Sequence, residues 1–421
     1  MLSTKVLISF YKIFQEGHYN YDVRKLKLLF IIYSQLGVKN MQGIPLEGLK
    51  VLDMTTSTFN YAGKLLAGFG ADVVKVEPPD GDPIRYQPPF VNDQVDPELS
   101  GRHLHMNTGK RSIVLDLEEN SDAMRVKDLI KDFDILIESY SPGYLNSLDL
   151  GYEQLSAIQP DLIMASITYF GQDGPYADYA GSELVADALS GYLYLTGDPD
   201  REPVKCFDNL IEQQSSLQAA VAIMTAVTAR ELQGGGDYLD ISATEAALFL
   251  LGGPAQMYHW TDRIAGRVGT RLMNSAPQMF YPSCIRPCKD GYVHAHSNTR
   301  YVDLLGILME QPRLNAPEIL ETPMGHADEI DEIMSRWLMK HDKFEVVRLA
   351  QEMRLPFTEV FTPEEIVNDD HLNERNFFVE VDHPIAGSVK QPGAPGMMTG
   401  TPWKTKRAPL LGEHQEEILG N

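Results

Sequence analysis

Glu212 is a carboxylate that the sequence places in the first turn of a long helix. The stretch from Pro203 to Leu232 predicts a loop that runs into this helix, because residues recur along it at three-and-four spacing: Leu217, Val221, Met224 and Thr228. Asn209 can cap the helix, so Glu212 would lie at its third position, where unpaired N–H groups and the helix dipole favour a negative charge. We therefore expect Glu212 to be ionised at neutral pH.

A purely structural role for Glu212 is the alternative. Asn209 and Glu212 have the spacing of a capping box, which would contribute about 1 kcal/mol to helix stability and nothing to chemistry. This local pattern alone does not decide between the two roles.

Two cysteines and two histidines lie close together further along the chain: Cys284, Cys288, His294 and His296. Their spacing matches no common zinc pattern, although His294 and His296 would share one face of a strand. We interpret the segment as a hairpin with two small apolar thiols, and expect no metal site. Its turn is Lys289-Asp290-Gly291.

The elements that must position Glu212 alternate between strands and helices. Strands are predicted at 49–55, 72–76, 111–117, 135–139 and 162–168, with helices at 62–69, 121–131 and 153–158. Such alternation indicates a parallel, doubly wound α/β sheet, whose ligands bind at the carboxyl ends of the strands. The candidate site therefore lies near 55–60, 77–85, 139–147 and 169–176. No G-x-G-x-x-G motif is present, which argues against a nicotinamide cofactor.

Composition and length restrict the class of protein. With 421 residues the chain is long enough for two domains. Its 36 basic and 59 acidic residues give a net charge of −23, which argues against nucleic acid or an anionic membrane as the main partner. The three cysteines do not form a disulfide framework, so we expect a cytoplasmic protein.

Residues 1–43 differ from the rest of the chain. They contain apolar clusters, but no run that approaches the roughly 20 apolar residues of a membrane span. They also lack the cleavage site of a signal peptide. We expect a poorly ordered extension.

Six motifs occur in one order along the chain: IPLEGLKVLDMT, GADVVKVEPPDGDPIR, NTGKRSIVLDL, ILIESYSPGYLNSLDLGYEQL, QPDLIMASITYFGQDGPYADYAG and RAPLLGEHQEEIL. From Ile44 to Leu419 the sequence resembles the class III coenzyme A-transferase family (CaiB/BaiF type), which includes carnitine and formyl-CoA transferases and α-methylacyl-CoA racemases. The resemblance implies an interlocked ring dimer. It also implies a Rossmann-like large domain built from both chain ends, residues 44–253 and 357–421, with a smaller inserted domain at 254–356.

The resemblance implies a covalent mechanism. In this family a carboxylate nine residues after a Pro-Val proline attacks an acyl-CoA thioester, and counting from Pro203 gives Glu212, where aspartate is usual. Glutamate can also form an acyl anhydride and a glutamyl-CoA thioester. Asp208 is the reserve candidate. Backbone N–H groups at the start of the helix would stabilise the oxyanion.

The implied ligands are an acyl-CoA and a small carboxylic acid, with coenzyme A as a substrate rather than a permanently bound cofactor. The coenzyme-binding residues that we predict are Glu77, Arg85, Lys110, Leu115, Tyr140, Ser141, Pro142 and Gly143. Three positions depart from the family pattern. Ser147 and Glu118 stand where cations are frequent, and Phe59-Asn60 replaces a Gly-Pro pair. Either Lys75, Arg85 or Lys110 supplies the positive charge at the coenzyme phosphates instead, or CoA is not the ligand.

Other functions remain open. Racemisation would require a histidine in the run Ala180-Gly181-Ser182-Glu183, and Ser182 cannot act as a base near pH 7. A divergent member could be a non-catalytic subunit, or could catalyse elimination or acyl transfer on a non-CoA thioester. No motif identifies the acyl donor or acceptor.

Overall fold

The computed structural model describes residues 43–271, 281–297 and 301–420. The predicted extension therefore lies almost wholly outside the described residues. Among them, no helix is both long and apolar enough to cross a membrane.

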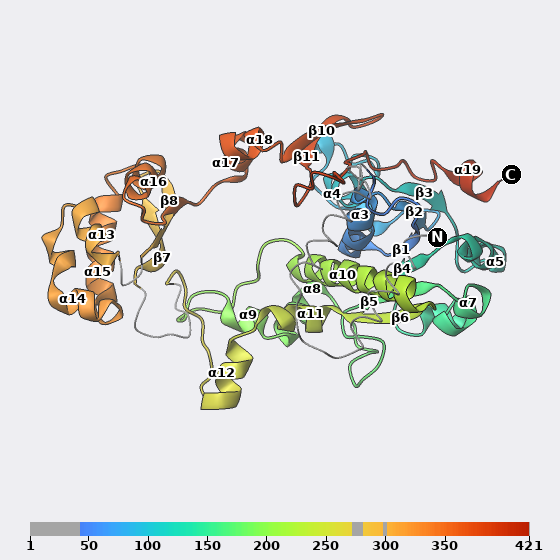
Figure 1. The fold of residues 1–421 in the computed structure, drawn as a ribbon, viewed down its shortest axis with the longest axis horizontal. Coiled ribbons are helices and arrows are strands. Elements are labelled where there is room, and N and C mark those ends of the chain that lie inside the picture. The colour runs from blue at the N-terminus through green and yellow to red at the C-terminus, as the bar shows by residue number, and fades with distance from the viewer. Residues whose placement is uncertain (1–42, 272–280, 298–300, 421) are drawn as a thin grey trace, which may run out of the picture. The chain divides into compact units, whose positions relative to one another are not determined.

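A parallel sheet of six strands organises the chain (Figure 1). Its strands are β1 (Lys50–Met54), β2 (Asp72–Glu77), β3 (Arg111–Val114), β4 (Ile135–Glu138), β5 (Ile163–Thr168) and β6 (Asp237–Ser242). They lie in the order β3-β2-β1-β4-β5-β6, which is the doubly wound order of mononucleotide-binding folds. The order reverses between β1 and β4, so a ligand is expected at the carboxyl ends of these two strands.

Alternate residues of each strand pack on opposite faces of the sheet, because successive side chains of a strand point in opposite directions. Ile135 and Ile137 of β4 join one buried apolar cluster, and Leu136 between them joins another. In β5, Ile163 joins the first of these clusters and Met164 joins the second. Both faces are buried, which explains why these strands are almost continuously apolar.

The helices that follow the strands cover these faces. The first cluster includes residues of α3 (Tyr61–Gly68), α8 (Glu183–Leu189), α10 (Leu210–Gln233) and α11 (Ala243–Leu250). The second includes residues of α5 (Asn120–Leu129), α6 (Tyr144–Ser147) and α7 (Tyr152–Ile158). The remaining described α-helices before residue 271 are α4 (Gly101–Met106), α9 (Tyr192–Leu195) and α12 (Pro254–Thr261).

The C-terminal segment lies along β3, which is an edge strand. The side chain of Gln415 accepts from the N–H of Val114 at 2.7 Å and donates to its carbonyl at 3.0 Å, so it takes the place of a neighbouring strand. His414 N–H also donates to the carbonyl of Ser112. The segment, which ends in α19 (Gln415–Leu419), thereby covers backbone groups that would otherwise be unpaired.

Residues 281–359 have a buried cluster of their own, which runs from Tyr281 to Phe357. Its sheet is formed by β7 (Ser283–Cys288), β8 (Gly291–His296) and β9 (Thr358–Glu359), and its helices are α13 (Val302–Leu308), α14 (Pro317–Glu321), α15 (Ala327–Leu338) and α16 (Lys343–Glu352). The predicted hairpin is confirmed. His294 and His296 share a face, with ring centroids 6.1 Å apart. The described residues contain no cluster that could hold a metal ion.

After this unit come α17 (Pro363–Asn368), α18 (Asp370–Glu374) and an antiparallel hairpin of β10 (Phe378–His383) and β11 (Gly387–Pro392). Short 3-10 turns lie at Ser57–Asn60, Pro83–Tyr86, Val91–Asp93, Ile130–Asp132, Pro312–Asn315 and Pro323–His326. The predicted strands and helices of the sheet are confirmed to within a few residues. β6 was not predicted, and β3 ends at Val114 because the chain turns there into the loop before α5.

Candidate active site

Glu212 lies in the first turn of α10, as predicted, and its carboxylate is held on both sides. The hydroxyl of Tyr169 donates to Oε1 at 2.6 Å, and Nδ2 of Asn209 donates to Oε2 at 2.9 Å. Nδ2 of Asn209 also donates to the hydroxyl of Thr58 at 3.0 Å. The side chain of Glu212 is therefore fixed by two neutral donors, Tyr169 and Asn209, and Thr58 holds the second of them in place.

The capping box considered as the alternative role of Glu212 does not form. The side chain of Asn209 accepts no hydrogen bond from the helix, although its residue is the N-cap. The carboxylate of Glu183, a residue of α8, caps the start of α10 instead. It accepts hydrogen bonds from the N–H of Ile211 at 2.9 Å and from the N–H of Glu212 at 3.0 Å. Burial and the charge of Glu212 raise the pKa of Glu183, while these two hydrogen bonds oppose that shift. The expected oxyanion donors at this end of the helix are thus occupied by Glu183.

Tyr169 directly follows β5, and its backbone is tied to the start of α11. Its carbonyl accepts from the N–H of Thr244 at 3.1 Å and from the Thr244 hydroxyl at 2.8 Å. Its ring makes an edge contact with Phe59, with centroids 5.4 Å apart. The ring also lies against Gly181, where a Cβ atom would come within 2.3 Å of Tyr169 Cδ2. Burial and the adjacent Glu212 carboxylate raise the pKa of Tyr169, so the phenol is protonated at neutral pH.

A cavity of about 310 Å³ adjoins Tyr169 at the point where the strand order reverses. It is lined by the loops after β1, β4 and β5 and by the segment before α8: Phe59, Ser139, Tyr140, Ser141, Pro142, Ile167, Thr168, Tyr169, Phe170, Ala177, Tyr179, Ala180 and Gly181. Gly143 lines a neighbouring cavity of about 760 Å³, together with Ser141 and Pro142. The predicted residues Tyr140 to Gly143 are therefore brought together at the carboxyl end of β4.

Glu138, the last residue of β4, lines the larger cavity but is 3% exposed. Its Oε2 accepts from the N–H of Tyr140 at 2.7 Å. Burial raises the pKa of Glu138 to about 7, so this carboxyl changes charge near neutral pH.

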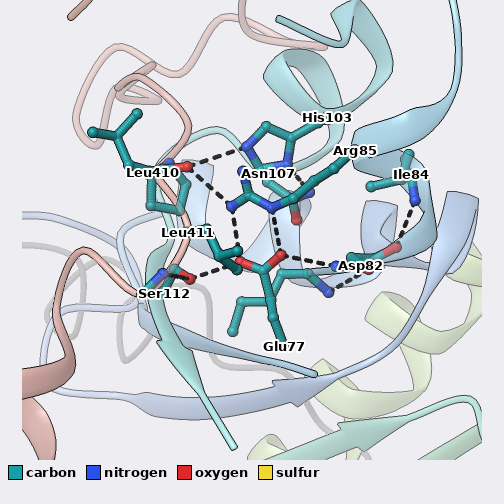
Figure 2. Close-up of polar contacts among 12 residues, drawn as sticks. Glu77, Asp82, Ile84, Arg85, His103, Asn107, Ser112, Leu410 and Leu411 are labelled. Carbon is teal, nitrogen blue, oxygen red and sulfur yellow. Dashed lines mark hydrogen bonds and ion pairs between the residues drawn. The ribbon is translucent and has the colours of Figure 1, made fainter. Parts of the chain in front are cut away.

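Glu77 and Arg85 are brought together, and neither lines the two cavities described above. The guanidinium of Arg85 donates to both oxygens of Glu77, at 2.6 and 2.9 Å, and neither side chain is exposed (Figure 2). Ser112 donates to the same carboxylate, and Arg85 also binds Glu98 and the carbonyl of Pro409. Burial opposes ionisation of Glu77, but the hydrogen bonds from Arg85 and Ser112 and the charges of Lys75 and Arg85 lower its pKa to about 2. In this arrangement Arg85 joins the C-terminal segment to the sheet, and coenzyme binding by either residue stays a prediction.

Lys110, Lys75 and Leu115 are also buried. The amine of Lys110 binds Asp53 at 2.6 Å, and that of Lys75 binds Asp82 at 2.7 Å. Lys75 further donates to Asn60 Oδ1 at 2.6 Å, so the second residue of the unusual Phe59-Asn60 pair belongs to a buried polar network. Leu115 lies in the apolar cluster under α5. These cations are committed to internal partners in the described structure.

The remaining candidates lie on the surface or in loops. The carboxylate of Asp208 is 2.5 Å from the guanidinium of Arg102. Ser147 donates to the carbonyl of Tyr144, and Glu118 is exposed. Ser182 caps α8 through the N–H of Val185. Sequence reasoning did not identify Tyr169 or assign a role to Glu183. Tyr169 lies in the window predicted after β5, but its distance from Glu212 in the chain gave no sign of their contact.

The chain belongs to CoA-transferase family III, whose sequence model matches residues 46–415. It is similar to succinyl-CoA–D-citramalate CoA-transferase of Chloroflexus aurantiacus, with 31% identity over 89% of this chain and 93% of that protein. It is also similar to the BbsE subunit of succinyl-CoA:(R)-benzylsuccinate CoA-transferase of Thauera aromatica, with 30% identity over 88% of this chain and 92% of that protein. A CaiB/BaiF family protein of Brucella suis superposes with a TM-score of 0.80 and 27% identity, and the match covers 89% of this chain and 98% of that chain.

Proposed function

We propose that the protein transfers coenzyme A from an acyl-CoA to a carboxylic acid, with Glu212 as the nucleophile. The observation that carries the proposal is the Glu212 carboxylate, which is 3% exposed and is held by Asn209 and by Tyr169, a residue that lines a cavity at the switch point of the sheet. Membership of CoA-transferase family III supports it. Two relatives are named for succinyl-CoA, which makes succinyl-CoA the first donor to test.

The reaction proceeds through covalent intermediates on Glu212. One carboxylate oxygen attacks the thioester carbonyl, and CoA thiolate leaves to give a mixed anhydride. The thiolate then attacks the glutamyl carbonyl carbon, and the donor acid leaves with the oxygen that had bridged the anhydride. The incoming acid attacks the glutamyl carbon of the resulting glutamyl-CoA thioester, and CoA thiolate leaves to give a second mixed anhydride. The thiolate then attacks the acyl carbon that came from the incoming acid, which releases the new acyl-CoA and the Glu212 carboxylate.

The test compares Glu212→Gln and Glu212→Asp with the wild type. Mass spectrometry after incubation with succinyl-CoA should show an adduct on the wild type that hydroxylamine removes. Glu212→Gln should lose the adduct and reduce turnover by several orders of magnitude with folding preserved, because an amide cannot attack a thioester. Glu212→Asp reports whether the site fits the longer acid. Shortening the side chain moves its oxygens by more than about 1 Å, and a displacement of that size can lower the rate about 10²-fold.

A second candidate is a subunit that works beside a different chain. The name of the Thauera aromatica relative, which is one subunit of its enzyme, favours this alternative. In that case Glu212→Gln would leave the activity of the assembled enzyme unchanged, and no adduct would form on this chain with any acyl-CoA. Turnover by Glu212→Gln at the wild-type rate would contradict the transferase mechanism proposed for this chain.

A further inference from the structure

We propose that the hydroxyl of Tyr169 is the hydrogen-bond donor that stabilises the oxyanion formed on Glu212 itself. The inference rests on the proposed function, because it concerns the steps in which a nucleophile attacks the glutamyl carbonyl carbon. Those steps place negative charge on one oxygen of Glu212, and the enzyme needs a donor at that oxygen.

The geometry assigns the two oxygens of Glu212 to different surroundings. Oε1 accepts the phenol of Tyr169 at 2.6 Å, which is the short distance typical of a charge-assisted O–H···O bond. Oε2 accepts the amide of Asn209 at 2.9 Å. A phenol is a stronger acid than a carboxamide, so the oxygen bound to Tyr169 is the better site for negative charge.

The reaction can be followed atom by atom on this basis. Oε2 attacks the donor thioester, and Oε1 remains as the carbonyl oxygen of the anhydride. When CoA thiolate adds to Cδ of Glu212, the C–S bond forms and the C=Oε1 electron pair moves to Oε1. The Tyr169 O–H donates to that oxyanion without transferring its proton. The pair then returns, the Cδ–Oε2 bond breaks, and the donor acid leaves as a carboxylate. Attack of the acceptor acid on the thioester forms the same oxyanion, from which thiolate leaves.

The backbone donors nearest to Glu212 are already used. The N–H groups of Ile211 and Glu212, which would serve an oxyanion at the helix start, both donate to the buried carboxylate of Glu183. Releasing them would leave that carboxylate without its hydrogen bonds in a buried position, which is costly. Tyr169 supplies a donor that needs no such rearrangement.

The phenol is also held in place before the reaction. Phe59 and Gly181 pack against the ring, and Thr244 binds the backbone of Tyr169. Its raised pKa keeps the proton on the phenol at neutral pH, as a donor requires. Phe59 belongs to the pair Phe59-Asn60, which stands where the family pattern has Gly-Pro, so this support is a feature of the present sequence.

The experiment uses the full chain with Tyr169→Phe, which retains the ring and its packing. Tyr176→Phe is the matched control, because Tyr176 is 43% exposed on the same loop and does not line the cavity. Turnover by Tyr169→Phe should fall about 10²- to 10³-fold, the loss typical of one oxyanion donor, with the thermal unfolding temperature unchanged. Tyr176→Phe should react like the wild type.

A single-turnover measurement separates an oxyanion donor from a residue that only orients the free carboxylate. The glutamyl-CoA thioester is allowed to accumulate with succinyl-CoA, the excess is removed, and its reaction with hydroxylamine is followed by mass spectrometry. This attack on Cδ needs an oxyanion donor but no free Glu212 carboxylate, so it should slow in Tyr169→Phe by a similar factor. Wild-type reactivity of the thioester in Tyr169→Phe would overturn the inference and leave the proposed function standing. Absence of any adduct on the wild type would overturn both.

Discussion

Glu77 and Arg85 form an ion pair whose side chains have no exposed surface, although both were predicted to contact the coenzyme. Replacing Arg85 by methionine would leave the Glu77 carboxylate buried without its charged partner. Loss of one partner of a buried pair typically costs about 3 to 5 kcal/mol. We therefore expect Arg85→Met to lower the free energy of unfolding by this amount, as measured by denaturant titration.

A matched control separates this effect from the loss of any arginine. Arg125, which is 55% exposed and lies 3.3 Å from Asp122, belongs to a surface pair. Surface pairs contribute little, so Arg125→Met should leave stability almost unchanged. Equal stability of the two variants would show that the Glu77 cluster opens readily to solvent, which would favour a direct role for Arg85 at the coenzyme.

The raised pKa of Glu138 predicts that the stability of the protein depends on pH. Its pKa is raised by burial from 4.5 to about 7 in the folded protein, so between these values the folded state keeps a proton that the unfolded state releases. The contribution of Glu138 to stability is therefore fully present below about pH 4.5 and is lost as the pH rises to about 7. The loss amounts to at most about 3 kcal/mol.

Glu138→Gln isolates this contribution, because glutamine imitates the protonated acid and can still accept from the N–H of Tyr140. Thermal unfolding at pH 5 should be similar for the two proteins, whereas at pH 8 the variant should be the more stable. A constant difference between them from pH 5 to pH 8 would contradict a raised pKa for Glu138.

At the scale of elements, the contact between the end of β5 and the start of α8 positions the phenol. Gly181 leaves room for the ring of Tyr169, and a Cβ atom there would approach Cγ and Cβ of Tyr169 as well as Cδ2, at 2.3 to 2.6 Å. These atoms lie near the root of the side chain and cannot move without the whole ring. Gly181→Ala should therefore displace the hydroxyl from Glu212.

We expect Gly181→Ala to reduce turnover by at least about 10-fold, because small displacements of catalytic groups are costly. Adding the change to Tyr169→Phe should cause little further loss, since the hydroxyl is already absent. A double-mutant cycle with steady-state kinetics measures this coupling. Independent, additive losses would mean that Gly181 acts through the cavity rather than through Tyr169.

At the scale of the whole molecule, the resemblance to the family predicts a homodimer. The chain carries a net charge of −23, so two copies repel one another at long range, and this repulsion is screened by salt. We expect light scattering coupled to size exclusion to show a dimer at micromolar concentration in 150 mM salt, with any dissociation confined to low salt. A monomer under both conditions would rule out an interlocked dimer.

The sequence by itself determined five of the six strands, most of their helices and the position of Glu212 in the first turn of α10. These features depend on local periodicity, turn residues and the short range of the helix dipole, and all of these are set by residues that are close together in the sequence. It also predicted which edge of the sheet would bind a ligand, because the carboxyl ends of parallel strands lie together whichever loops follow them.

Only the tertiary structure decided which polar groups meet. Tyr169 and Glu183 lie 43 and 29 residues from Glu212, yet they bind its carboxylate and its backbone N–H. Arg85, which we predicted as a coenzyme ligand, is enclosed by its partner Glu77 and by the carbonyl of Pro409, 324 residues away. A buried charge takes whichever partner the fold brings within hydrogen-bond distance, and that choice depends on the packing of distant segments rather than on spacing in the sequence.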